Sequence, residues 1–292
     1  FIKDLFLGTE TRFGRVLISE DILPETIAST PTPENSLYIL DYERATYLIK
    51  NAKHISLSMC YCRHKMHHLG KDCSKPMDTC LTFDSTAYSL IKNGYGRKID
   101  SSECIDILNM CYENNLVQCG ENVRNEICFL CNCCCCCCEG LKAVKKYGAL
   151  HPIATTNFLP YVNNDACIGC GKCTKICPIE VISLKNKKAS IDESICLGCG
   201  VCVRNCPTKA IKLKTRSQRI LTPANTTHRV IIQAIEKGNL QNLIFDNQAF
   251  ASHRFMASVL STILNANPIK QALASKQFKS IYLDKLISKK YK

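Results

Sequence analysis

The sequence of 292 residues lacks the features that mark several large classes of protein. It contains no run of 18 apolar residues, which a membrane-spanning helix would need, and no pattern of a secretory signal peptide. It also contains no glycine-rich nucleotide fingerprint, so nothing in it indicates a flavin or nicotinamide site. Residues 215–292 carry no catalytic motif and no clustered metal ligands. These absences argue against a membrane protein and against a nucleotide-dependent enzyme.

Acidic side chains become scarce along the chain. Residues 1–157 have a net charge of −1, residues 158–214 of +5 and residues 215–292 of +9. Basic surface of this kind favours docking on an acidic protein, a phosphate-bearing ligand or a membrane surface. The alternative is a solvated helical face that also offsets the negative charge of bound clusters. We expect an acidic redox partner protein or a larger oxidoreductase complex, and no nucleic acid.

Cysteine is abundant, with 23 residues. This number exceeds what structural packing needs, and the motifs below require reduced thiolates. Both points argue against a disulfide framework and for a reducing compartment. We therefore expect the protein in the cytoplasm, in an anaerobic setting.

Eight cysteines form two runs with one spacing. Each run reads Cys-x2-Cys-x2-Cys-x3-Cys-Pro, first from Cys167 to Pro178 and again from Cys196 to Pro207. In this iron–sulfur pattern the fourth cysteine ligates the other cluster. The expected ligands of the two [4Fe–4S] clusters are Cys167, Cys170, Cys173 and Cys206 for one, and Cys196, Cys199, Cys202 and Cys177 for the other. A zinc site also uses Cys-x2-Cys pairs, but it does not explain the repeated x3-Pro spacing.

Residues 158–214 resemble the two-cluster bacterial ferredoxin domain. The resemblance implies small β-hairpins, short helices and low-potential one-electron transfer. Glycines between the cysteines suit a backbone that wraps closely around sulfur. Apolar stretches after each proline, 181–184 and 210–213, predict strands, and residues 186–188 predict a turn.

A second group of cysteines lies before residue 150. The candidate metal ligands there are Cys60, Cys62, Cys73, Cys80, Cys131, Cys133, Cys134, Cys136, Cys137 and Cys138. We expect one or two further iron–sulfur clusters from them. One grouping places the first four at one site and the rest at another, and mixed groupings are equally compatible with the sequence. A metallothionein-like sink for soft metals is the alternative for the polycysteine run.

Residues 40–213 resemble a family of multi-cluster iron–sulfur proteins from anaerobes. The motifs that carry the resemblance are Cys60-Tyr-Cys-Arg63 and Cys131-Asn-Cys-Cys134. Relatives usually carry another residue at the position of Cys135, which leaves the role of this thiol open. Cys104 and Cys111 fit small core residues. Arg63 is a candidate donor to a cluster sulfide, or a partner of a nearby aspartate.

Local patterns predict the following elements. Helices are expected at 42–52, from Asp84 to about 94, after the capping pair Asp100 and Glu103, at 137–147, at 226–238, at 247–265, after Pro268 and at 278–287. Strands are expected at 54–59, 116–119 and 127–130. The fold class is α+β, with a Cys-rich α/β domain at 1–150, a ferredoxin-like domain at 151–214 and a basic helical extension at 215–292.

The leading hypothesis for function is an electron-transfer subunit of an oxidoreductase, rather than an enzyme by itself. It would relay low-potential electrons through several [4Fe–4S] clusters to a partner. One alternative is a reductase whose polycysteine-bound cluster is the catalytic site. The other is an iron–sulfur redox-sensing regulator.

Overall fold

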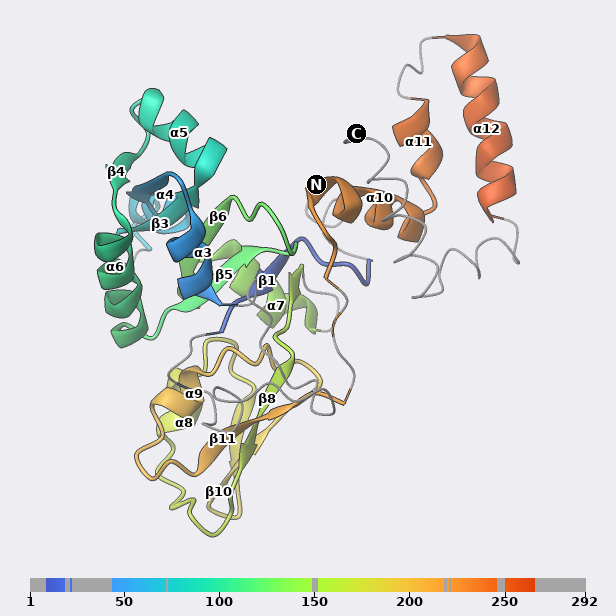
Figure 1. Cartoon of the computed structure of the whole chain (residues 1–292). Helices are drawn as coiled ribbons and strands as arrows, with labels where there is room; N and C mark the ends of the chain where they lie inside the picture. The colour runs from blue at the N-terminus through green and yellow to red at the C-terminus, as the bar shows by residue number, and fades with distance from the viewer. Residues whose placement is uncertain are drawn as a thin grey trace, which may run out of the picture. The chain divides into compact units, whose positions relative to one another are not determined.

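The computed structural model of the chain describes residues 9–18, 22, 44–71, 73–148, 152–217, 220, 222–245 and 250–265. The chain divides into two compact units (Figure 1). The larger unit comprises Phe13–Glu121 and Ile127–Ile220, and the smaller comprises Phe1–Arg12, Asn122–Glu126 and Leu221–Lys292. The larger unit thus contains both the N-terminal cysteines and the ferredoxin-like segment. The division into three domains stays a prediction.

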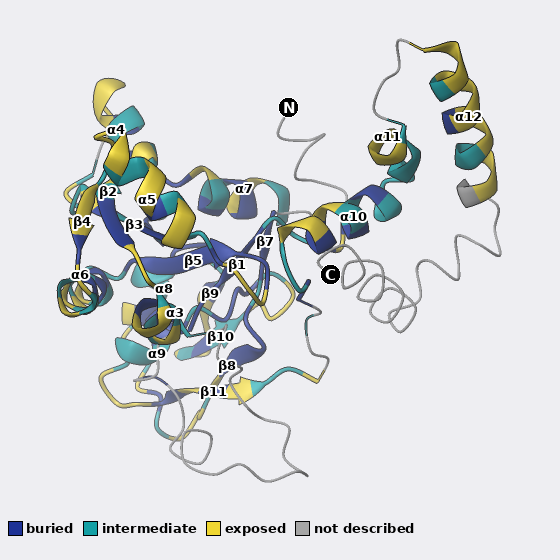
Figure 2. Cartoon of the chain, turned by 45° about the horizontal axis from the view of Figure 1, so that its top comes forward, coloured by how far each residue is buried: buried dark blue, intermediate teal, exposed yellow. Residues whose placement is uncertain are grey.

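A sheet lies at the centre of the larger unit. Among the described residues its seven strands are, in spatial order, β4 (Arg97–Ile99), β2 (Ile55–Met59), β3 (Asp78–Phe83), β6 (Phe129–Cys133), β5 (Val117–Glu121), β1 (Gly14–Val16) and β7 (Ile153–Ala154). Neighbours pair antiparallel except β1 and β7, which are parallel. Every residue of β1 and β5 is buried, and Figure 2 shows both strands inside the unit. Strands β2, β5 and β6 overlap the segments in which strands are predicted.

Helices connect the strands of this sheet. They are α3 (Ala45–Asn51), α4 (Tyr61–His68), α5 (Asp84–Lys92), α6 (Ser101–Glu113) and α7 (Glu139–Tyr147). Ile49 of α3 and Leu108 of α6 pack with Leu57 and Leu81 of the sheet in one apolar cluster. Cys104 belongs to the same cluster and is fully buried, which confirms it as a core residue. The expected mixture of α and β structure is confirmed.

Capping chemistry sets several helix ends. The Asp100 carboxylate accepts a hydrogen bond from the Glu103 N–H at 2.8 Å, so it caps α6 as predicted. Gly148, with φ of +54°, follows the last residue of α7 as predicted. Asp84 does not cap α5, because its carboxylate instead accepts the N–H of Lys53 at 2.8 Å.

Helix α4 covers a segment for which the local sequence patterns predict no element. Its face toward the protein carries Arg63 and Met66, which are buried, while His67 and His68 are exposed. The spacing of the two buried residues is that of one helix face. Only two residues of this short, polar segment face inward, so its hydrophobic periodicity is too weak to predict a helix.

The ferredoxin-like segment consists of two small antiparallel sheets and two short helices. The strands are β8 (Phe158–Val162) with β11 (Ile211–Thr215), and β9 (Ile182–Lys185) with β10 (Lys188–Ile191). The helices are α8 (Lys172–Ile176) and α9 (Val201–Arg204). Asn186 and Lys187 form the predicted turn between β9 and β10, and both have positive φ.

The smaller unit contains α10 (Thr226–Glu236), α11 (Leu240–Ile244) and α12 (Ala251–Asn265). Asn225 caps α10 by accepting the N–H of His228 at 2.9 Å, one residue before the predicted caps. The apolar pattern of the helix expected at 247–265 predicts that Phe250, Phe255, Val259 and Ile263 face inward, but they are 38–68% exposed, so this prediction is wrong. Figure 2 shows α12 as largely exposed. The helices expected after Pro268 and at 278–287 lie outside the described residues. Within the described part of the chain, no helix combines the length and apolar character needed to cross a membrane.

Candidate metal centres

Each ferredoxin-like run of cysteines passes through a tight loop before a short helix. Gly171 and Gly200 precede α8 and α9 with φ of +72° and +75°. Gly169 and Gly198 also have positive φ, and a Cβ on either would come closer than 3.0 Å to a backbone carbonyl. Only glycine combines this conformation with so close an approach. The loops therefore have the shape expected around a bound inorganic cluster.

A pocket lies inside the first of these loops. The residues that line it include Cys167, Cys170 and Cys173 together with Cys206 from the second run. Burial raises the pKa of the Cys206 thiol, but hydrogen bonds from the Ile211 N–H and neighbouring groups outweigh this and lower the pKa. A lower pKa favours the thiolate, which is the form that binds metal. The four cysteines predicted for one cluster thus share one cavity.

The other four ferredoxin-like thiols lie deeper. Cys196 and Cys202 are 7% exposed, and Cys177 is an electrostatic neighbour of Cys196, Cys199 and Cys202. Burial raises the pKa of Cys196 to about 11 and that of Cys199 to about 12. Cys177 therefore lies beside the second triad, as crossed ligation requires.

This deeper group borders the Cys-rich part of the same unit. Leu197 and Val201, at most 1% exposed, share an apolar cluster with Val16 of β1 and Leu141 of α7. Further contacts join the two parts: Arg204 lies over the Tyr112 ring at 4.3 Å from its centroid. The ferredoxin-like segment is thus packed against the N-terminal sheet rather than held apart from it.

Four N-terminal thiols form what we call the outer thiol site. Its members are Cys73, Cys134, Cys136 and Cys137, whose sulfur atoms all lie within 4.8 Å of one another. Cys73 Sγ lies 3.9 Å from Cys134 Sγ and 3.7 Å from Cys137 Sγ. The turn after β6 brings three thiols of the polycysteine run together, and the segment between α4 and β3 adds Cys73. This is one of the mixed groupings that the sequence leaves open.

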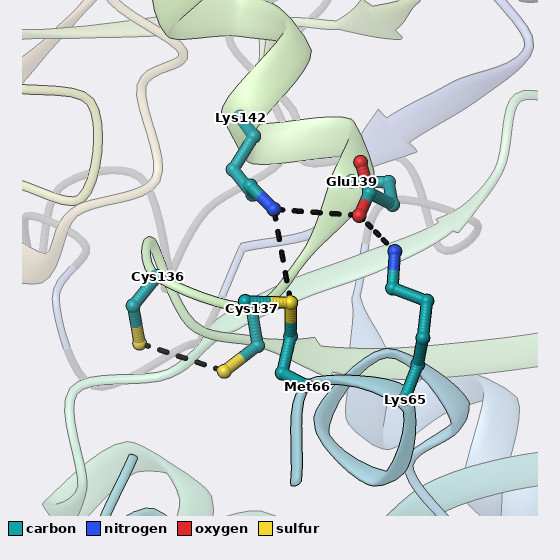
Figure 3. Close-up of polar contacts among 6 residues, drawn as sticks. All are labelled: Lys65, Met66, Cys136, Cys137, Glu139 and Lys142. Atoms are coloured by element: carbon teal, nitrogen blue, oxygen red, sulfur yellow. Dashed lines mark hydrogen bonds and ion pairs between the residues drawn. The ribbon is translucent and has the colours of Figure 1, made fainter. Parts of the chain in front are cut away.

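Charged side chains join α4 and α7 near Met66, which shares an apolar cluster with Cys73, Cys134 and Cys137. Figure 3 shows Glu139 between Lys65 and Lys142, with an ion pair to each, and Lys142 Nζ also lies 4.0 Å from the sulfur of Met66. These contacts join the two helices next to Cys137. Cys136 is exposed, whereas Cys134 and Cys137 are buried. The site therefore reaches the surface at one thiol.

Arg63 is the buried cation of this region, at 1% exposure. Its guanidinium donates to Thr79 Oγ1 and to the carbonyl of Asn132, each at 2.6 Å. Burial lowers its pKa, but nearby thiols, Cys60 and Cys134 foremost, raise it overall. In turn, burial raises the pKa of Cys134, while the Cys137 N–H and the Arg63 charge lower it to about 7. The sequence leaves two roles open for Arg63, a donor to cluster sulfur or a partner of a nearby aspartate. Among the described residues, its guanidinium lies beside cysteine sulfur.

Six other thiols form a second N-terminal group, the interior thiols. They are Cys62, Cys80, Cys119, Cys131, Cys133 and Cys138. Their side chains interact in a series: Cys62 with Cys138, Cys138 with Cys133, Cys133 with Cys131, and Cys131 with Cys80. Cys119 branches from Cys133. The candidate ligands of the N-terminal part are thus divided between two places.

Cys60, Cys128 and Cys135 belong to neither group. Cys128 is half-buried just before β6. Cys60 precedes α4, and its electrostatic neighbours are Arg63 and Cys62. Cys135, although it lies within the run, makes no thiol contact among the described residues. Cys119, which is not among the ligands predicted from the sequence, joins the interior thiols. Its position in β5 opposite Cys131 of β6 is the signal that could have revealed it.

Comparison with known proteins identifies a domain within the ferredoxin-like segment. Residues 166–210 match the family model of the 4Fe-4S dicluster domain. A stretch of 28 residues is 57% identical to Ferredoxin-2 of Desulfomicrobium norvegicum, and it covers 10% of this chain and 48% of that protein. The match thus spans about half the length of the curated relative. The expected bacterial-type ferredoxin domain is confirmed, and with it iron–sulfur binding.

Proposed function

Starting from a 4Fe-4S dicluster domain at residues 166–210, we propose that this chain is a multi-cluster electron-transfer protein. The observation that carries the proposal is the pocket lined by Cys167, Cys170 and Cys173 with Cys206, because it gathers four thiolate donors across the two runs. These four fit one [4Fe–4S] cluster, and Cys196, Cys199, Cys202 and Cys177 fit the second. Such clusters supply one-electron chemistry at low potential when they are bound.

The chain's own residues have three tasks in this function. The thiolates hold the clusters, and the tight glycine loops bring backbone N–H groups close to sulfur. The apolar cluster with Leu197 and Val201 excludes water from the deeper site, which affects its potential. The outer thiol site offers four more thiolates for a further iron–sulfur cluster, and the buried charge of Arg63 beside it offsets negative charge.

An acidic redox protein or a larger oxidoreductase is the proposed partner, in the cytoplasm of an anaerobe. Cys170 is exposed at the first ferredoxin pocket, and Ile168 beside it is 68% exposed. Lys172 and Lys175 of α8 and Lys209 are exposed near this loop. The exposed apolar side chain of Ile168 lies near a predicted cluster ligand, and lysine side chains lie around it. Such a surface is complementary to an acidic protein surface.

Anaerobic purification with iron and sulfide determination, followed by electron paramagnetic resonance of the reduced protein, tests the proposal. Two ferredoxin clusters alone give about 8 iron atoms per chain, and each further [4Fe–4S] cluster adds about 4. The reduced protein should also pass electrons to an acidic one-electron carrier protein. Zinc in place of iron, or reduced protein that no protein acceptor reoxidises, would contradict the proposal.

The exposed thiol of Cys136 favours a second candidate, a reductase that acts at the outer thiol site. A small substrate could approach a metal there, whereas the other N-terminal thiols are covered to a greater degree. Turnover of a small oxidised substrate by the reduced chain, in the absence of a partner, distinguishes this candidate. Loss of that turnover in Cys136→Ala, with the ferredoxin signal intact, would support it.

A further inference from the structure

The interior thiols occupy one face of the central sheet. Cys131 and Cys133 are two positions apart in β6, and side chains at that spacing point to the same face of a strand. Cys119 of β5 is the cross-strand partner of Cys131, so its side chain lies on this face too. Asn132, between the two cysteines, points the other way and bonds to Gln118 and to the carbonyl of Thr79. Because side chains alternate between the two faces of the sheet, the thiols of Cys119, Cys131 and Cys133 all lie on the same face.

Neighbouring elements complete the group. Cys80 comes from β3, the other neighbour of β6, and makes its thiol contact with Cys131. Cys62 in the first turn of α4 and Cys138 just before α7 contact each other above this face. Five elements thus place six thiols on or next to one face of the sheet. Cys133, which contacts three other thiols, is at its centre.

Packing alone does not account for these thiols. Cysteine serves as a small core residue elsewhere in the unit, at Cys104 and Cys111, and neither of those makes a thiol hydrogen bond among the described residues. The interior thiols, in contrast, contact one another in an unbroken series. Cys119, Cys133 and Cys138 are only 7–8% exposed. A dense set of soft donors in a dry interior is the environment of a thiolate-bound metal.

The charge of Arg63 points the same way. A buried cation is costly unless an opposite charge lies near it. The groups that act on this guanidinium through charge are thiols of both N-terminal groups, including Cys134 of the outer site and Cys133 of the interior one. Its guanidinium donates to two uncharged oxygens, those of the Thr79 side chain and the Asn132 carbonyl, and its buried Nε has no hydrogen-bond acceptor among the described residues. Metal-bound thiolates would supply the missing negative charge.

We propose that the interior thiols form an iron–sulfur site of their own, centred on Cys133 and Cys138 and distinct from the outer thiol site. This inference rests on the proposed function, because it assumes that the N-terminal part holds iron. The site draws its ligands from six thiols, which is two more than a single cube needs. It borders the deeper ferredoxin site, since Cys199 is an electrostatic neighbour of Cys119 and both line one apolar cluster.

Paired alanine variants of the full chain test the inference. The interior variant is Cys133→Ala with Cys138→Ala, the outer variant is Cys134→Ala with Cys137→Ala, and Cys135→Ala is the control from the same run. Each protein is purified anaerobically, its iron and sulfide are counted, and its reduced state is examined by electron paramagnetic resonance. We expect the interior and outer variants each to lose one cluster's iron, about 4 atoms for a cube, and to keep the ferredoxin signals. The control should lose none.

The possible outcomes separate the two proposals. If the outer variant loses iron and the interior variant does not, the interior site is refuted while the relay stands. If neither loses iron, the N-terminal clusters of the proposed function are refuted. If both variants lose the same cluster, so that the combined variant loses no more than either, the two groups are one site and the inference is wrong.

Iron in the unmodified chain provides a measurement that does not depend on how the variants fold. With both N-terminal sites filled by cubes, the chain holds about 16 iron atoms, against about 12 with the outer site alone. A fully reconstituted protein that stays near 12, and whose third cluster is lost in the outer variant, overturns the interior site.

Discussion

Replacing Gly169 with alanine should weaken the first ferredoxin loop far more than the same change at Gly171. Both glycines have left-handed backbones, with φ of +67° and +72°, so both variants incur about 1–2 kcal/mol of backbone strain. Only Gly169 has backbone in the way. A Cβ there would come closer than 3.0 Å to the Lys187 carbonyl, whereas a Cβ on Gly171 would lie 3.6 Å from Leu184 Cδ1. Lys187 lies in the tight β9–β10 turn with positive φ, which limits its retreat.

The extra crowding at Gly169 should cost about 1–3 kcal/mol beyond the shared strain. If the native state is destabilised by this amount and the transition state for cluster loss is not, the barrier falls by the same amount and the rate of loss rises about 5- to 150-fold. The assay follows the visible absorbance of the anaerobic holoprotein over time at a fixed elevated temperature. Loss of a bound cluster is irreversible, so a rate is measured rather than an equilibrium free energy. Gly94→Ala, where nothing lies within 4 Å and φ is +72°, reports strain alone at a remote turn. Equal rates for the Gly169 and Gly171 variants would refute the reasoning.

Three further predictions follow from contacts described above. Arg63→Met should lower the reduction potential of the outer cluster by about 60–130 mV, which is the equivalent of a charged hydrogen bond of about 1.5–3 kcal/mol. An unchanged potential in a redox titration would show that the guanidinium does not interact with the cluster. Lys172→Glu with Lys175→Glu should slow electron transfer to an acidic carrier protein and weaken the dependence of its rate on salt. The control, Lys92→Glu on α5, should change neither the rate nor its salt dependence. If the control slows transfer as much as the double variant does, docking takes place elsewhere. Leu197→Ala should cost about 2–5 kcal/mol of stability and speed loss of the deeper cluster in the absorbance assay, and no change would contradict a shared core.

The ferredoxin half of the site could be predicted from sequence because its information is local. The spacing from Cys167 to Cys177, and again from Cys196 to Cys206, fixes both loops, and the pocket that includes Cys206 is consistent with the crossed pairing. The match to a dicluster domain adds independent support for cluster binding. In short repeated motifs of this kind, the spacing within the motif determines most of the local geometry.

The N-terminal sites could not be predicted in the same way, because their geometry depends on contacts between distant segments. Cys73 meets Cys134 and Cys137 only after the connection from α4 to β3 is placed beside the turn that follows β6. Cys119 joins the interior thiols through the register of β5 on β6, which the sequence does not specify. Cysteine spacing alone therefore suggested several groupings without a means of choosing among them.

The packing of Leu197 and Val201 against the N-terminal core also has a consequence for biogenesis. Cys133 and Cys138 belong to the same cluster as these two side chains, so the ferredoxin segment covers the interior thiols once it has folded. Synthesis proceeds from the N-terminus, and early segments begin to fold first. The thiols up to Cys138 leave the ribosome before Leu197, which opens an interval for metal delivery. Maturation of this chain should therefore follow the order of translation, with the innermost centre filled first and the ferredoxin segment closing over it.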